Sequence, residues 1–83
     1  MKRIKFTVHA SSMLEMRCGQ FGLNAEEGKR RCIETILFGR CERKNTKKIY
    51  YKYYNDNLLF YLICKENSYF IRVFTIIIKT GRM

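Results

Sequence analysis

The sequence contains no proline, no tryptophan and only one histidine. Six tyrosines and six phenylalanines must therefore supply most of the aromatic bulk. A single histidine does not complete a Cys/His zinc site of familiar spacing, and the four cysteines form no C-x-x-C pair. We therefore expect no bound metal and no cofactor.

Long apolar runs are missing as well. The longest uncharged ones, LLFYLIC and VFTIII, are far shorter than the ~20 residues that cross a bilayer. The N-terminal stretch MKRIKFTVHASSML lacks the continuous apolar segment of a secretory signal. These absences predict a cytoplasmic protein that does not enter a membrane and whose thiols stay reduced.

Negative charge is scarce, with 7 Asp and Glu against 17 Lys and Arg, a formal net charge of +10. The 83 residues, 47% of them hydrophobic, predict one globular domain spanning residues 1–83. A domain this basic usually binds a polyanion, most often nucleic acid. An acidic protein partner, an acidic membrane surface or a surface that is basic only for solubility are the alternatives.

Hydrophobic periodicity predicts an α+β fold. Alternation over residues 3–8 predicts a strand, and apolar spacing from Ala10 to Arg17 predicts a helix. Asn24 and Glu27 form an N-terminal capping pattern for a second helix ending at Phe38. Residues 40–48 read as a basic connector, residues 48–54, 58–64 and 69–78 as strands, and residues 79–83 as a polar tail. The expected order is β-α-α-β-β-β, with two helices packed on a mostly antiparallel four-stranded sheet.

His9 lies where the first strand gives way to the first helix. An imidazole with a pKa near ~6.5 can exchange a proton at cellular pH, although a lone histidine at a junction can equally serve as a turn residue. Arg17 follows about two helical turns later and is either a phosphate ligand or an ordinary solvated arginine.

Tyrosines cluster in KIYYKYY. Strand alternation puts Tyr51 and Tyr53 on one face and Tyr50 and Tyr54 on the other, so one pair is core. The other pair either stacks on bases or consists of tyrosines that simply favour a strand. In the last strand, Arg72 and Thr75 have opposite parity, so a regular strand cannot direct both to one site. The candidate phosphate-binding residues, which could instead form a merely solvated surface, are Arg40, Arg43, Lys44, Lys47, Lys48 and Lys52.

The segment FTVHASSMLEMR resembles the opening of short bacterial proteins in the RelE/ParE-like toxin superfamily, whose pattern is a strand, T-x-H-A, a helix with arginines, a second helix and three strands. Thr7, His9, Ala10 and Arg17 match this pattern, and Met13 replaces its first helical arginine. The closing VFTIII resembles the final strand, with Thr75 at the motif threonine. The likeness covers nearly the whole chain in order and length.

The resemblance implies a barnase/colicin/RelE-type ribonuclease fold and a toxin that cuts tRNA or mRNA without a metal. His9 would act as base or acid, Arg17 would hold the scissile phosphate, Thr75 would donate a hydrogen bond, and Tyr53 or Tyr51 would position a base or share the proton transfer. It also implies an acidic antitoxin or immunity protein as partner. The alternative is a non-catalytic module of the same fold that binds nucleic acid or inhibits a protein, since some relatives in this superfamily act on gyrase rather than RNA.

Overall fold

The computed structural model describes residues 2–81. In chain order its elements are β1 (Arg3–Phe6), α1 (Val8–Gln20), α2 (Ala25–Phe38), β2 (Arg40–Lys44), β3 (Lys47–Tyr53), β4 (Leu58–Glu66) and β5 (Phe70–Thr80). The five strands form one sheet in the order β1-β5-β4-β3-β2. β1 runs parallel to β5, and the other three strand pairs are antiparallel. The expected α+β class and the two helices are confirmed.

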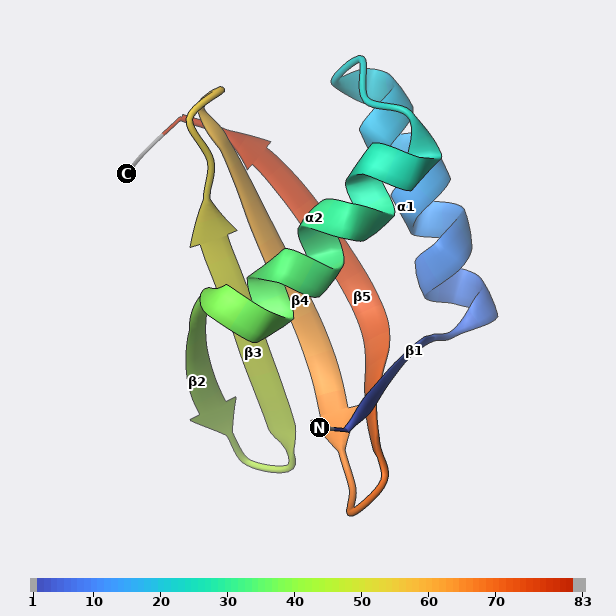
Figure 1. Ribbon diagram of the computed structural model, residues 1–83, viewed down its shortest axis with the longest axis vertical. Helices are drawn as coiled ribbons and strands as arrows, with labels where there is room; N and C mark the ends of the chain where they lie inside the picture. The colour runs from blue at the N-terminus through green and yellow to red at the C-terminus, as the bar shows by residue number, and fades with distance from the viewer. Residues whose placement is uncertain (1, 82–83) are drawn as a thin grey trace.

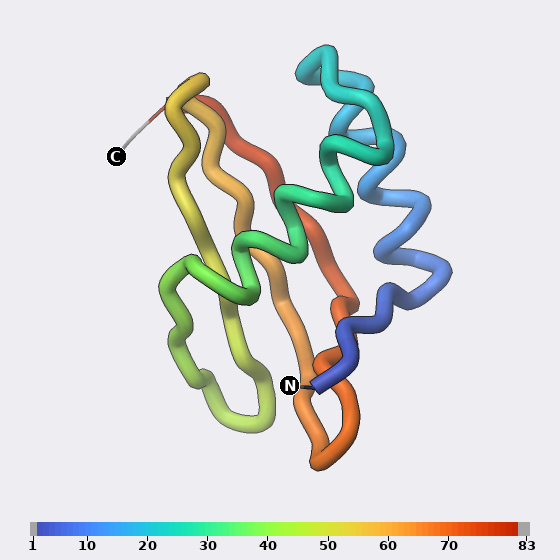
Figure 2. The backbone as a smooth tube through the Cα atoms, in the orientation of Figure 1, coloured from blue at the N-terminus to red at the C-terminus, as the bar shows by residue number. Residues whose placement is uncertain are grey.

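Both helices contribute to one core on a single face of the sheet. In Figure 1, α2 crosses the sheet diagonally over β3 and β4, and α1 stands beside it next to β5. The tube in Figure 2 shows how short β1 is before the chain turns away into α1. The fully buried side chains of the core are those of Ala10, Cys18, Cys32, Phe60, Leu62, Cys64, Val73 and Ile76. The apolar strand β4 is the middle strand of the five, as its nearly continuous apolar sequence indicates.

The expectation of four strands in the order β-α-α-β-β-β is wrong, because residues 40–44 of the supposed connector form the edge strand β2. This strand pairs with β3 from Arg40 opposite Tyr51 to Lys44 opposite Lys47, across a turn in which Asn45 adopts a φ of 55°. All five of its side chains are exposed. A strand held only by backbone hydrogen bonds at a sheet edge needs no apolar alternation, so its sequence resembles a charged loop.

Several expected boundaries also move, and the first strand ends at Phe6 rather than at residue 8. α1 begins at Val8 rather than Ala10, because the Thr7 hydroxyl accepts a hydrogen bond from the Ala10 amide at 3.0 Å and caps the helix there. Asn24 caps α2 as expected, through a 2.8 Å hydrogen bond from the Glu27 amide. β5 continues to Thr80 into the segment read as a tail, and residues 82–83 of that segment lie outside the described part of the chain.

The opposite face of the sheet carries no helix or other element within residues 2–81, and we call it the open face. Its membership follows from strand alternation and register, since residues directly opposite each other in a sheet point the same way. The pair Cys41 and Tyr50 faces the helices, for example, and the pair Arg40 and Tyr51 faces away. The open face comprises Arg3, Lys5, Arg40, Glu42, Lys44, Lys47, Ile49, Tyr51, Tyr53, Leu59, Tyr61, Ile63, Lys65, Phe70, Arg72, Phe74, Thr75, Ile77 and Lys79.

Candidate nucleic-acid interface

The excess of positive over negative charge is largest on the open face, because only one of the seven carboxylates lies there. Eight Lys and Arg residues lie there against one carboxylate, that of Glu42, which gives the face a formal excess of seven positive charges. The eight cations are Arg3, Lys5, Arg40, Lys44, Lys47, Lys65, Arg72 and Lys79. None of them takes part in an ion pair within the described residues. Their field is therefore uncompensated and attracts a polyanion.

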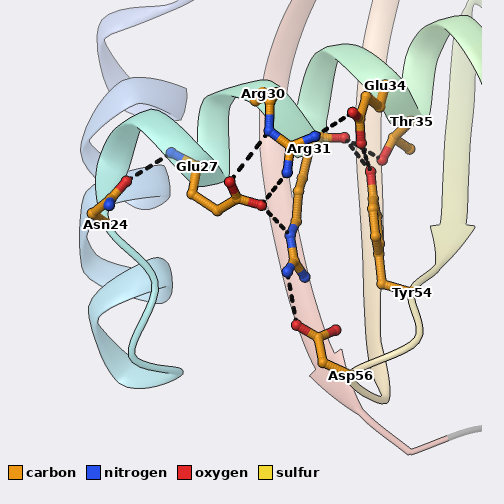
Figure 3. Close-up of polar contacts among 8 residues, drawn as sticks. All are labelled: Asn24, Glu27, Arg30, Arg31, Glu34, Thr35, Tyr54 and Asp56. Carbon is orange, nitrogen blue, oxygen red and sulfur yellow. Dashed lines mark hydrogen bonds and ion pairs between the residues drawn. The ribbon is translucent and has the colours of Figure 1, made fainter.

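The ion pairs of residues 2–81 lie instead on the side of the helices. Figure 3 shows the larger group, in which Arg31 of α2 bonds to Glu27 at 2.9 Å and reaches Asp56 of the β3–β4 turn at 2.8 Å. Arg30 bonds to Glu27 and Glu34 along the same helix. Hydrogen bonds from the arginines lower the pKa of Glu27 and of Asp56, and the bond to Asp56 raises the pKa of Arg31. This group uses three of the seven carboxylates to connect α2 to the sheet.

A second cluster involves Glu66 at the end of β4. Its carboxylate accepts hydrogen bonds from Lys2, from Lys48 at 2.9 Å and from the Tyr50 hydroxyl at 3.1 Å. The Lys2 and Lys48 ammonium groups lower the pKa of Glu66 to about 2. Burial and the hydrogen bond to Glu66 raise the pKa of the Tyr50 hydroxyl. Four carboxylates are thus neutralised by cations away from the open face, which leaves the two faces of the sheet with different charge.

The centre of the open face is apolar and aromatic. A hollow of about 610 Å³ is lined by Tyr53, Leu59, Tyr61, Ile63, Ile77, Lys79, Thr80 and Gly81. The Tyr61 ring stacks on Tyr51 of the neighbouring strand, with centroids 6.2 Å apart and an interplanar angle of 26°. Partly exposed aromatic rings beside cations are the features that bind the bases and phosphates of single strands. The expected division of the tyrosines holds, since Tyr50 and Tyr54 contribute to the core and Tyr51 and Tyr53 face outward.

A β-bulge in β5 changes the geometry expected for Arg72 and Thr75. Ile63 pairs with Thr75 and Cys64 pairs with Val73, so Phe74 is an extra residue in β5. The bulge reverses the parity of the strand, and Arg72 and Thr75 consequently lie on the same face despite their odd spacing. A smaller hollow of about 270 Å³ borders Thr75 and is lined by Lys47, Ile63, Cys64, Lys65, Phe74 and Thr75.

His9 is the second residue of α1 and is exposed. The start of this helix is attached to β5 beside the bulge, because the Thr7 amide donates a hydrogen bond to the Val73 carbonyl at 3.1 Å. This contact attaches the start of α1 to β5 two residues before Thr75, while α1 packs on the helix side of the sheet and the Thr75 side chain lies on the open face. The His9 side chain takes part in no hydrogen bond or ion pair within the described residues.

Arg17 lies two turns after His9, about 12 Å along the helix axis. It is half-buried, and its Nε is shielded from solvent and has no hydrogen-bond partner among the residues described. Met13, also half-buried, lies between the two residues at i+4 spacing from each. Side chains of a helix lean toward its N-terminus, so the long Arg17 side chain extends in the direction of His9.

The structure does not bring all of the expected catalytic residues together. Tyr53 lies at the far end of β3, two strands and four residues of register away from Thr75, or roughly 10 Å across and 14 Å along the sheet. Tyr61, which sequence reasoning did not single out, pairs with Ile77 and lies nearer to Thr75. Tyr61 alternates with buried residues along β4, but the sequence does not reveal this because the side chains on both faces of that strand are largely apolar.

The six expected phosphate-binding residues divide between the two faces. Arg40, Lys44 and Lys47 lie on the open face. Arg43, Lys48 and Lys52 have the opposite parity, and there Lys48 is paired with Glu66 while the Lys52 ammonium lies 4.1 Å from the centroid of the Tyr54 ring. The open-face cations outside the expected set are Arg3, Lys5, Lys65, Arg72 and Lys79.

No protein-family model matches the chain, and no curated protein or solved structure matches it significantly. Neither α1 nor α2, the two helices of the described part, is long and apolar enough to cross a membrane. In residues 2–81, His, Cys, Asp and Glu side chains form no group of three that could hold a metal ion.

Proposed function

We propose that this protein binds RNA on the open face and cleaves it without a metal, as a toxin ribonuclease. The observation that carries the proposal is the segregation of charge: eight cations without ion-pair partners among the described residues share the uncovered side of the sheet with partly exposed tyrosines. Phosphates neutralise such cations, and unpaired bases stack on such rings. A duplex would contact the cations alone, so an unpaired strand matches this face better, and RNA is the class of strand that the proposed cleavage chemistry requires.

The cleavage step would take place at the outer edge of β5. Metal-free cleavage needs a group that takes the proton of the ribose 2′-OH, a cation beside the phosphate and a group that protonates the 5′ leaving oxygen. His9 performs a proton transfer, since it is exposed, unengaged and attached beside the bulge. Arg17 contributes charge from the same flank of α1, and the Thr75 hydroxyl donates a hydrogen bond to a phosphate oxygen. Tyr53 serves as a remote base-stacking residue in this arrangement.

The cysteines indicate the cellular compartment, and the charge pattern indicates the partner. Four free cysteines, three of them buried, suit a reducing cytoplasm. A face with seven excess positive charges would be neutralised by an acidic protein that covers it, which is the role of an antitoxin or immunity protein. Such a protein would compete directly with RNA.

The test is cleavage of total RNA in EDTA by the purified wild type, His9→Ala and Ser12→Ala. Ser12 is an exposed residue of the same helix, so Ser12→Ala controls for any general effect of an alanine substitution in α1. Wild type and Ser12→Ala should release discrete fragments, and His9→Ala should be slower by about 10²- to 10⁴-fold. Intact RNA with the wild type, or equal cleavage by His9→Ala, would overturn the catalytic assignment.

A second candidate is a module on the same face that binds without cutting, either gripping nucleic acid or inhibiting a protein. The separation of Tyr53 from Thr75 favours it, because two of the expected catalytic groups do not meet. A nucleic-acid-binding module would leave the RNA intact and hold it in a salt-dependent complex. A protein inhibitor would leave the RNA intact and unbound, and would instead capture a single protein target.

A further inference from the structure

Five cations of the open face form a single row across the sheet, one from each strand. Arg72 of β5 lies opposite Lys5 of β1 and opposite Lys65 of β4. Farther along the same face, Lys47 of β3 lies opposite Lys44 of β2. Lys48 pairs with Cys64, so the same antiparallel register places Lys47 beside Lys65. We call Lys5, Arg72, Lys65, Lys47 and Lys44 the cation row. With strands ~4.8 Å apart, it spans about 19 Å.

The row is unfavourable in the protein alone. Like charges directly opposite one another destabilise a sheet, and none of the five has a carboxylate partner within residues 2–81. Two of the ammonium groups lie over rings of the same face, Lys5 at 4.0 Å from the Phe70 centroid and Lys65 at 5.6 Å from that of Phe74. These contacts keep the charges on the open face rather than letting them turn away from it.

On one side of the row, the face becomes apolar. Along β4, Ile63 follows Lys65 at about 7 Å and Tyr61 at about 14 Å, and the Tyr61–Tyr51 stack lies at that level. A surface with a line of cations beside a band of rings and aliphatic side chains matches one nucleic-acid strand, which has phosphates along one edge and bases along the other. A duplex hides its bases and would leave the apolar band uncovered.

We propose that the cation row binds the phosphates of one RNA strand that crosses the β-strands, with unpaired bases lying on Tyr61, Tyr51 and Ile63. The proposal rests on the proposed function in that it takes single-stranded RNA as the ligand, and it adds the path of the strand and the residues that hold its phosphates and its bases. Thr75 pairs with Ile63, about 7 Å along the sheet from the level of Arg72 and Lys65, so a phosphate held by Arg72 lies beside the proposed cleavage edge.

The experiment measures binding of a fluorescent 2′-O-methyl oligoribonucleotide by anisotropy over a range of salt concentrations. This probe lacks the 2′-hydroxyl used in metal-free cleavage, so binding is observed without cutting. The variant Lys47→Gln/Lys65→Gln removes two cations of the row. The matched control Arg43→Gln/Lys52→Gln removes the same charge from the side of the helices.

Loss of two phosphate contacts should reduce the slope of log K against log salt by about 1.4, since each contact to a single strand contributes about 0.7. The helix-side control should keep the wild-type slope. Tyr61→Leu should weaken the single strand by about 5- to 150-fold and leave a duplex of the same length unaffected.

Each outcome identifies what has failed. Absence of RNA binding by the wild type overturns the proposed function together with the row. Equal loss of slope in the row variant and the helix-side control overturns the row alone, and RNA binding itself then stands. Equal affinity for single strand and duplex, with no effect of Tyr61→Leu, overturns the base-binding half. Binding that follows the row in a protein that cuts no RNA refutes the catalytic proposal and supports the row.

Discussion

Replacing Lys47 by glutamine should make the folded protein more stable while weakening its hold on RNA. Lys47 is exposed at the first position of β3, directly opposite Lys44 and beside Lys65. No other interaction of its side chain is present in residues 2–81, so the substitution removes two repulsions and little else.

The size of the effect follows from the spacing. Two unit charges about 5 Å apart in water repel by roughly 0.8 kcal/mol. Like charges directly opposite in a sheet cost up to about 1 kcal/mol per pair. With two neighbours, Lys47→Gln should raise the free energy of unfolding by about 0.5–1.5 kcal/mol at low salt, or Tm by about 2–12 °C for a domain of this size. At about 1 M salt the Debye length falls to about 3 Å, and the gain should largely vanish.

Thermal unfolding followed by circular dichroism at low and high salt measures this prediction. Lys79→Gln is the control, because Lys79 lies on the same face opposite Leu59 and has no cation across from it. Adding RNA should raise the Tm of the wild type more than that of Lys47→Gln, since the stabilisation by a ligand grows with the logarithm of its concentration divided by Kd. A Lys47→Gln protein that is no more stable than wild type at low salt, or a gain that persists in high salt, would refute the repulsive row.

Three further predictions concern the scaffold. Asn24→Ala should lower the free energy of unfolding by about 0.5–2 kcal/mol, because the Glu27 amide loses its 2.8 Å acceptor; an unchanged urea midpoint would contradict this. Gly28→Ala should destabilise the protein by about 1–3 kcal/mol despite alanine's helix propensity, because its Cβ would lie 2.2 Å from Cys18 Sγ. A higher urea midpoint than that of the wild type would show that Cys18 shifts to make room for the added methyl group. The pKa of Glu66 is lowered from 4.5 to about 2 in the fold, so its contribution to stability is full above pH 4.5 and is lost as the pH falls toward 2. Glu66→Gln should therefore differ most from wild type in urea unfolding at neutral pH, and a difference that stays constant down to pH 2 would exclude the ion pairs as its source.

Short-range patterns were sufficient for most of the elements. The Asn24 cap, the helix that follows it and the strands around Tyr50, Leu62 and Ile76 each depend on residues within one turn or one strand, and their alternation or helical spacing is visible in the sequence. The edge strand β2 was missed because its five exposed side chains carry no period, and its existence depends on hydrogen bonds to β3.

Composition and order by themselves determined the α+β class, the large excess of positive charge and the placing of Tyr51 and Tyr53 on one face of their strand, because each depends on local chemistry or on the two-residue period of a strand. The packing of the helices on the face of Tyr50 decided that Tyr51 and Tyr53 point outward. Only the tertiary structure decided which cations act together. Carboxylates distant in sequence neutralise Arg31 and Lys48, the bulge at Phe74 turns Thr75 to the face of Arg72, and the pairing of five strands aligns one cation from each into a row. Those outcomes depend on register and on contacts between distant segments, which no local pattern encodes.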